Sequence, residues 1–257
     1  LLHFQGSIKR RRRLWLFSVA AGVLLVSLLG QAQPVERYLE QRLYRDRILL
    51  SHDTPYQHIT VTRWRRDVRL FINGNLEFSS IDEYRYHEAL VHLPASIAPR
   101  LEAALILGGG DGLAARELLK YRALRGITLV DIDPEIVRLC RTDPTLSALN
   151  ARALEDPRVR VVNADAYKFL EEDGRLYDLI VVDLPDPNNE ALGKLYTRQF
   201  YELAARRLSA GGVLVTQASS PYYAREAFWC VARTVEAAGL RVFPYHAYVP
   251  SFGDWGF

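Results

Sequence analysis

The chain has 257 residues, 49% of them hydrophobic and 25% charged, which is enough for one sizeable core with a small appendage. Residues 1–69 hold 13 Lys and Arg against 5 Asp and Glu, a net charge of +8, whereas residues 70–257 hold 20 against 25, a net −5. A mildly acidic globular part argues against nucleic acid as a partner and favours a cationic ligand. The two cysteines, Cys140 and Cys230, indicate neither a disulfide framework nor a zinc site, and we predict no metal.

The N-terminus combines a short polar segment with an apolar run. Residues 1–8 resemble the remnant of a protease-cleavable tag and are set aside. Five basic residues then precede Leu14–Gly30, 17 residues without a charge. As a helix this run would span roughly 25 Å, just short of a typical hydrocarbon core. We predict a transmembrane helix with a basic flank over residues 9–32; a cleaved signal peptide and a buried or partner-bound helix are the alternatives. Basic residues flank the run on both sides, so the excess of positive charge that orients a membrane helix nearly cancels.

The periodicity then changes from helical to strand-like. Residues 33–52 carry a polar, Arg-rich helical pattern, which predicts a linker helix at the membrane surface. Beyond them the period becomes two, and Asn73-Gly74 is a strong type I′ hairpin signal. These patterns predict a small antiparallel β domain over residues 53–80. A helix should begin after Asp82 and end near Pro94.

A glycine-rich turn, Gly108–Gly112, joins the short apolar run Leu105–Leu107 to a helical pattern that begins at Leu113. Strand, glycine turn and helix form the first unit of nucleotide-binding α/β folds, in which a ligand approaches the backbone where no Cβ intervenes. Helix entries that bind no ligand also carry such turns. Here, however, a second apolar strand ends in Asp131, about 20 residues past the glycines, where an acceptor for ribose hydroxyls belongs.

Strands and helices continue to alternate toward the C-terminus. This alternation predicts a doubly wound, Rossmann-like parallel sheet over residues 81–257, whose ligands bind at the carboxyl ends of the strands. Four acids occupy such places: Asp111, Asp131, Asp165 and Asp183. A single acid there is often a helix cap or a turn residue, but four coincident placements indicate a site.

The chemistry of these acids suits a nucleoside that carries positive charge. Asp131 would hold ribose hydroxyls, and Asp165 would lie near an adenine amino group. Asp111, inside the glycine turn, would repel the carboxylate of S-adenosylmethionine but pair with its ammonium. Decarboxylated S-adenosylmethionine keeps the ammonium and lacks the carboxylate, so it fits this loop.

A second feature is the carboxylate pair of Asp183 and Asp186 around a Pro-Asp-Pro sequence. An alkyl amine has a pKa of about 10, like lysine, and therefore arrives protonated. One carboxylate can hold the cation while the other accepts its proton. Turn and cap chemistry alone would also place acids in such a proline-rich loop.

Taken together, these stretches resemble the spermidine synthase (polyamine aminopropyltransferase) family over about residues 54–257. The matching stretches are Tyr56–Ile59, Asp82–Glu88, Gly108–Gly112, Asp156–Val159, Asp183–Pro187, Leu195–Tyr196 and Val249–Ser251. The resemblance implies a class I methyltransferase-like catalytic domain. It implies transfer of the aminopropyl group of decarboxylated S-adenosylmethionine to a di- or polyamine, with release of methylthioadenosine. The first choice of reaction is the conversion of putrescine to spermidine. The resemblance also implies no cofactor beyond that co-substrate, and a homodimer or larger assembly.

The resemblance further implies roles for individual residues. Asp183 would be the catalytic base. The donor would contact Gln57, His87, Gly108, Gly110, Asp111, Asp131, Asp165 and Ala166. The amine would contact Asp186, Glu77, Tyr86, Gln57, Phe252 and Trp255.

Several positions depart from the family pattern. Asp131 stands where the family usually has Glu, Glu77 where it has Gln, and Ala166 where it has Gly. Phe252 stands where many members have a tyrosine that touches the amine. The family also continues with another strand beyond Phe257, so we expect a shortened C-terminus.

The apolar N-terminal run fits the membrane-helix-bearing subset of the family. We therefore expect a membrane protein, in the inner membrane of a bacterium, whose catalytic domain faces the cytoplasm. Two other functions stay open: an S-adenosylmethionine-dependent methyltransferase, and a non-catalytic membrane-anchored polyamine sensor.

Overall fold

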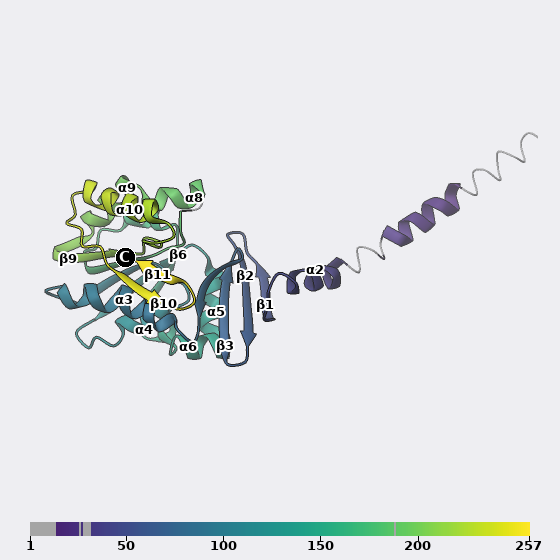
Figure 1. Cartoon of the computed structure of the whole chain (residues 1–257), viewed down its shortest axis with the longest axis horizontal. Helices are drawn as coiled ribbons and strands as arrows, with labels where there is room; N and C mark the ends of the chain where they lie inside the picture. Colours follow the sequence, from purple (N-terminus) through teal and green to yellow (C-terminus); the bar gives the residue numbers. More distant parts are fainter. Residues whose placement is uncertain (1–13, 26, 28–31, 188) are drawn as a thin grey trace, which may run out of the picture.

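The computed structural model describes residues 14–25, 27, 32–187 and 189–257 (Figure 1). The predicted tag remnant, residues 1–8, lies outside them, as does part of the predicted membrane segment 9–32. Residues 14–25 are helical, and the large apolar side chains of Leu14, Trp15 and Phe17 are more than half exposed. Within the described ranges, no helix has the length and hydrophobicity needed to cross a membrane.

An antiparallel sheet precedes the larger domain. Within the described part of the chain it has four strands in the order β1-β2-β3-β4. They are β1 (Arg47–Asp53), β2 (His58–Trp64), β3 (Asp67–Ile72) and β4 (Asn75–Ser79). The predicted hairpin is confirmed: Asn73 and Gly74 have φ of +51° and +81°, the left-handed values that both central residues of a type I′ turn require.

The linker helix is shorter than predicted. Residues 33–52 are not helical throughout: helix α2 covers Ala32–Gln41, and β1 begins at Arg47. Pairing explains the difference, because β1 runs antiparallel to β2 with Ser51 opposite Thr60, and a strand partner outweighs a weak local helical pattern. The Gln41 side chain stabilises the turn of the chain between α2 and β1. Its Nε2 donates to Asp46 O (2.8 Å), and its Oε1 accepts from Ile48 N (3.0 Å).

The larger domain is built on a parallel sheet, which confirms the predicted Rossmann-like fold class. Among the described residues the sheet has five strands in the order β7-β6-β5-β8-β9. They are β5 (Ala103–Gly108), β6 (Gly126–Asp131), β7 (Val159–Asn163), β8 (Tyr177–Asp183) and β9 (Leu208–Thr216). The chain runs outward from β5 to β7 and then returns to β8 on the other side. The carboxyl ends of β5 and β8 therefore form the switch point at which such sheets bind ligands.

Helices cover both faces of the parallel sheet (Figure 1). One face carries α3 (Glu83–Ile97), α4 (Leu113–Leu118), α5 (Pro134–Thr142) and α6 (Pro144–Leu149). The other carries α7 (Ala166–Glu172), α9 (Arg198–Arg206) and α10 (Arg225–Ala237), and the short elements are η1 (Ala153–Glu155), α8 (Glu190–Gly193) and η2 (Lys194–Tyr196). Successive strand residues face opposite sides, so Ile106 packs with the first group of helices, and Leu105 and Leu107 with the second. The N-terminal sheet shares the first core through Ile59 and Phe78.

Helix α3 passes Pro94 and ends at Ile97, beyond its predicted end. A proline so near the end removes only one hydrogen bond of the helix, and Ala98 N still donates to Pro94 O (3.2 Å). The chain then closes with a two-stranded antiparallel sheet, β10 (His246–Val249) and β11 (Gly253–Gly256). Tyr245 OH donates to Ala89 O (2.9 Å) and so fastens this hairpin to α3.

Candidate functional site

The glycine loop after β5 lies directly against the end of β8. Gly108 and Gly109 have φ of +85° and +62°, and a Cβ on Gly108 would collide with the backbone oxygen of Asp183. Gly109 N donates to the same oxygen (3.1 Å). Because the two backbones touch, glycine at position 108 sets the distance between the loop and Asp183.

Asp131, the last residue of β6, holds the loop from its other side. Its Oδ2 accepts from Gly110 N and its Oδ1 from Asp133 N, each at 2.9 Å. A Cβ on Gly110 would lie 2.5 Å from Asp131 Oδ2, so this position also requires glycine. Burial raises the pKa of Asp131 to about 6, and the two hydrogen bonds limit the rise. Asp131, the residue predicted to bind the ribose hydroxyls, is therefore ionised at neutral pH and lies beside the loop.

Asp183 ends β8 at the switch point. Its Oδ1 accepts a hydrogen bond from Tyr86 OH (2.8 Å), which comes from α3. Burial raises the pKa of Asp183, while the charge of His87 and the Tyr86 hydrogen bond oppose the rise. A carboxylate with a raised pKa is a stronger proton acceptor than an exposed one, which suits the predicted base.

Asp186 lies in the loop after β8 and is held from the end of β9. Gln217 Nε2 donates to its Oδ1 (3.2 Å), and Ser219 Oγ donates to its Oδ2 (3.1 Å). Ser219 has φ of +63°, a conformation uncommon outside glycine, and its N–H donates to Gln217 Oε1 (2.9 Å). The sequence analysis missed Gln217 and Ser219, because no local motif marks them and only sheet pairing brings them to Asp186.

His87 of α3 is buried, and the charges of Asp111 and Asp183 act on it. Its Nδ1 lies 2.9 Å from Glu83 Oε2, and Arg116 in turn pairs with both Glu83 oxygens at 2.8 and 2.9 Å. Burial alone would lower the pKa of His87. The hydrogen bond to Glu83 and the charges of Asp111 and Asp183 outweigh burial and raise that pKa to about 9. His87 thus offsets part of the negative charge of the site.

Asp111 lies in the glycine loop, close to His87 and Asp183. Its Oδ1 accepts from Leu113 N (2.8 Å), and its backbone oxygen accepts from Asn150 Nδ2 (2.8 Å). Burial raises the pKa of Asp111 to about 6, His87 opposes the rise and Asp183 adds to it. The loop therefore offers an anionic group to the cleft near pH 7.

Gln57 joins the N-terminal sheet to the parallel sheet. Its Nε2 donates to Asp133 Oδ2 (2.8 Å), and Thr54 Oγ1 donates to the same oxygen (2.9 Å). Asp133 is fully buried and caps α5, since its Oδ1 accepts from Glu135 N (3.0 Å). Gln57 therefore lies close to Asp131, the residue predicted to bind the ribose, because Asp133 is only two residues away. Asp133 is a further site-positioning residue that the sequence analysis missed.

Glu77 of β4 is only partly exposed, and it lies close enough to the acids of the cleft for their charges to act on it. In the β3–β4 pair, Leu70 lies opposite Phe78 and Phe71 opposite Leu76, which leaves Glu77 unpaired in a β-bulge. Burial, followed by the charges of Asp183, Asp111 and Asp186, raises the pKa of Glu77 to about 8.

Aromatic side chains form one wall beside Asp183. The ring centroid of Tyr86 lies 6.2 Å from that of Phe252 and 6.5 Å from that of Trp255. Phe252 and Trp255 belong to the β10–β11 hairpin, and the Asp82 carboxylate holds its turn by accepting from Ser251 N (2.7 Å) and Ser251 Oγ (2.8 Å). Trp255 Nε1 is buried and has no hydrogen-bond partner among the described residues. The structure thus brings together the three aromatic residues predicted to contact the amine.

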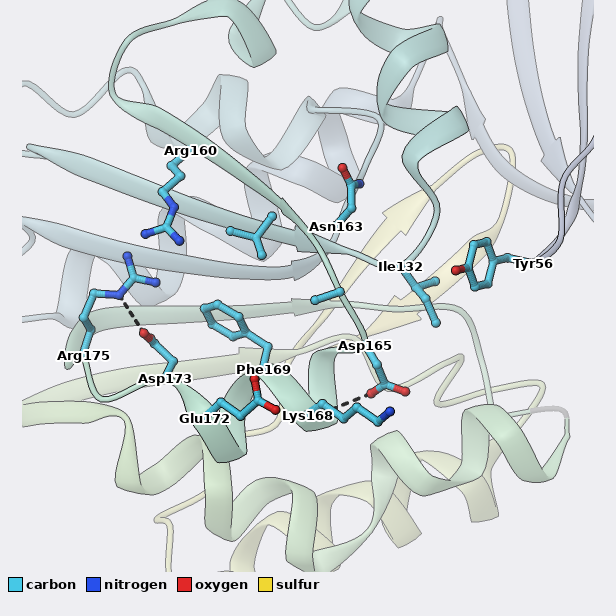
Figure 2. Close-up of a pocket in the computed structure, with 12 residues that line it drawn as sticks. Tyr56, Ile132, Arg160, Asn163, Asp165, Lys168, Phe169, Glu172, Asp173 and Arg175 are labelled. Carbon is cyan, nitrogen blue, oxygen red and sulfur yellow. Dashed lines mark hydrogen bonds and ion pairs between the residues drawn. The ribbon is translucent and has the colours of Figure 1, made fainter.

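Asp165 and Ala166 lie farther along the sheet, where β7 passes into α7. Asp165 caps α7 by accepting from Tyr167 N (2.9 Å) and pairs with Lys194 Nζ (2.6 Å). Asp165 lies beside a cavity of about 640 Å³. Figure 2 shows its lining side chains, with Ile132 and Asp165 at one end and Arg160 and Arg175 at the other. Asp165, one of the two residues predicted to lie at the adenine, therefore borders an open cavity next to the end of β6, whereas Ala166 is buried and does not line it.

Glu88, His92 and Glu117 are the one group of metal-binding residue types found close together in the described ranges. Lys120 Nζ pairs with Glu117 and lies 4.0 Å from Glu88 Oε1. Arg116 also pairs with Glu117, at 2.9 Å. Lys120 and Arg116 thus make this cluster an ion-pair network centred on the buried carboxylate of Glu117.

The fold and the acid cluster define a Rossmann-like protein whose switch point suits a positively charged nucleoside and a second cation. Residues 83–257 match the family model described as "Spermine/spermidine synthase domain", and the chain belongs to this family. Polyamine aminopropyltransferase of Leptospira interrogans is 47% identical over 93% of this chain and 48% of its own length. Polyamine aminopropyltransferase 2 of Ralstonia nicotianae is 46% identical over 100% of this chain and 51% of its own length. The chain spans about half the length of these curated relatives.

Two crystal structures of spermidine synthase have a similar fold. One is a complex with the transition state analogue AdoDATO; it gives a TM-score of 0.77 at 25% identity, over 82% of this chain and 72% of that chain. The other, from Thermotoga maritima, gives a TM-score of 0.75 at 25% identity, over 82% and 71%.

Proposed function

We propose that the chain is an aminopropyltransferase that uses decarboxylated S-adenosylmethionine as donor and a di- or polyamine, putrescine first, as acceptor. The observation that carries the proposal is the acidic cleft, in which the charges of Asp111, Asp183 and Asp186 all act on Glu77. Such a cluster suits a sulfonium and several ammonium groups together. Membership of the family and the names of the relatives support the same reaction.

In the proposed mechanism, Asp183 removes a proton from the reacting ammonium and so frees the nitrogen lone pair. The nitrogen attacks the carbon of the aminopropyl chain that is bonded to the sulfonium. A C–N bond forms there, and the bond between that carbon and sulfur breaks. The electron pair of that bond passes to sulfur and leaves neutral methylthioadenosine. Asp186 holds the amine, Asp111 holds the ammonium of the donor, and Asp131 holds its ribose.

The nucleoside product tests the proposal against its two alternatives. The protein is incubated with S-adenosylmethionine or its decarboxylated form and a panel of amines, and the products are identified by mass spectrometry. Methylthioadenosine supports aminopropyl transfer, whereas S-adenosylhomocysteine would establish a methyltransferase. Binding of amine or nucleoside without turnover would establish a sensor.

Asp111→Asn is expected to change donor selectivity. The amide keeps an acceptor for Leu113 N but loses the ion pair with the donor ammonium, which is worth about 1–3 kcal/mol when partly desolvated. Binding of decarboxylated S-adenosylmethionine, measured by calorimetry, should weaken about 5- to 150-fold. Binding of S-adenosylmethionine itself should stay constant or improve. Equal losses for both ligands would show that Asp111 only shapes the loop.

We further propose that residues 9–32 anchor the protein in a membrane, the bacterial inner membrane, with the catalytic domain facing the cytoplasm. The uncharged run Leu14–Gly30 and its basic flank support this location. After expression in bacteria, the protein should stay in the membrane pellet through an alkaline carbonate wash, and added protease should reach the catalytic domain only in inverted vesicles. Recovery in the supernatant would contradict the proposal.

The resemblance to the family also supports a homodimer or larger assembly. Light scattering coupled to size exclusion should give at least twice the mass of one chain. A monomeric mass would contradict this part of the proposal.

A further inference from the structure

Glu77 stands apart from the other acids of the cleft in how its carboxyl is held. The carboxylates of Asp183, Asp186 and Asp131 each accept at least one hydrogen bond from a fixed donor. Within the part of the chain that the structure describes, no donor pairs with the Glu77 carboxyl. The β-bulge at Glu77 is the kind of irregularity that redirects a side chain next to a functional site.

Charged and titratable groups from several elements act on Glu77 or on the acids beside it. The carboxylates are Asp183 of β8, Asp186 of the following loop, Asp111 of the glycine loop and Asp131 of β6. Helix α3 adds the hydroxyl of Tyr86 and the cation of His87. The four carboxylates against one imidazolium leave a net charge of −3 before Glu77 is counted. A fifth carboxylate in the empty cleft would therefore face strong repulsion.

The substrates of the proposed function reverse this balance. The donor brings a sulfonium and an ammonium, and a diamine brings two more positive charges. Together they exceed the net −3 of the other groups by one charge, which an ionised Glu77 would neutralise. Charge neutrality in the occupied cleft thus calls for the carboxylate form of Glu77, and repulsion in the empty cleft calls for the acid form.

We propose that Glu77 is a proton-linked binding group for the amine: its carboxyl carries a proton in the empty cleft and releases that proton to solvent when the cationic amine binds. This inference rests on the proposed function and adds a specific role for the one acid that replaces the glutamine usual in the family. No bond other than the O–H bond of the carboxyl breaks, and the proton passes to buffer.

The sign of the pH dependence follows from the pKa of Glu77. That pKa is about 8 in the empty cleft, and a bound cation lowers it because the cation stabilises the carboxylate. Between the two pKa values, binding releases a proton, so affinity for the amine rises with pH and levels off above about pH 8. Asp111 and Asp131 have pKa values of about 6 and contribute little to this window.

Calorimetry measures the released proton directly. Putrescine is titrated at about pH 7.5 into the protein saturated with an unreactive donor analogue that keeps both positive charges, with a quaternary ammonium in place of the sulfonium, in phosphate and in Tris buffer, whose ionisation enthalpies differ. The dependence of the binding enthalpy on buffer should correspond to about 0.7 proton released for the unmodified protein. Glu77→Gln should release close to none, whereas Glu77→Asp, which keeps a titratable carboxyl, should still release a proton. Glu236→Gln, an exposed glutamate of α10, is the matched control and should behave like the unmodified protein.

Steady-state kinetics at saturating donor provides the second readout. Between about pH 7 and pH 8.5 the KM for putrescine should fall several-fold in the unmodified protein and stay flat in Glu77→Gln. At the upper pH the variant should have a KM about tenfold higher, with kcat and donor affinity unchanged. A residue that only supports the fold would change kcat or the melting temperature instead.

The outcomes separate the two levels of the argument. If Glu77→Gln releases as many protons as the unmodified protein, or keeps its pH-dependent KM, the role of Glu77 is wrong while the aminopropyltransferase activity stands. If the unmodified protein forms no methylthioadenosine from the decarboxylated donor, the proposed function fails and the inference fails with it.

Discussion

Asp183→Asn is expected to lower kcat by about 100-fold or more, the range typical of losing a general base. The amide keeps the shape of the side chain and can still accept from Tyr86 OH, but it cannot take the proton of the reacting ammonium. Initial rates of methylthioadenosine release at saturating donor and putrescine measure the effect.

Two control measurements separate the loss of a base from other causes of a low rate. Affinity for methylthioadenosine should be unchanged, because the loop and Asp131 are untouched, and an unchanged affinity excludes misfolding as the cause. The rate of the variant should recover as the pH approaches about 10, where the free amine no longer needs a base. Retention of most activity at pH 7 would show that Asp183 is not the base.

Gly108→Ala is expected to have the second large effect, on both stability and donor binding. Its φ of +85° costs an L-residue about 1–2 kcal/mol, and the added Cβ would collide with the backbone oxygen of Asp183. Relief of that collision requires the loop and β8 to separate, at a further cost of about 1–3 kcal/mol. We expect a melting temperature lower by several degrees and affinity for methylthioadenosine reduced by about 100-fold.

The matched control is Gly126→Ala at the start of β6. A Cβ there has no neighbour within 4 Å, and the residue has no left-handed φ. It should retain the melting temperature and ligand affinity of the unmodified protein. If Gly108→Ala behaved like this control, the contact between the glycine loop and the end of β8 would not be rigid.

The fold and the centre of the site could be predicted where local rules are strong. The glycine turn after β5 requires backbone conformations that only glycine adopts readily, and Asn73-Gly74 requires a type I′ turn, so both are visible in the sequence. Asp131 and Asp183 follow apolar strands, and parallel pairing brings such ends to one edge. For these features, residue type and spacing already contain the physical cause.

Other features depend on partners distant in sequence. Residues 47–52 were predicted to be part of a helix because their local pattern is weak, and they belong to β1 only through pairing with β2. Gln217 and Ser219 carry no motif, yet the β8–β9 pairing places them on Asp186. Asp133 becomes a tether only because Thr54 and Gln57 reach it from the other sheet.

The pKa values of the side chains in the cleft also could not be predicted from the sequence. The amino-acid sequence by itself determined that Asp111, Asp131 and Asp183 lie at the carboxyl edge of the sheet, because strand ends and a glycine turn are local properties. Only the tertiary structure decided how the groups of the cleft titrate: the pKa of Glu77 is raised to about 8, and that of His87 to about 9. The reason is that burial and charge–charge interactions depend on the distances among side chains from β4, α3, the glycine loop and β8, which exist only after the two sheets have packed together.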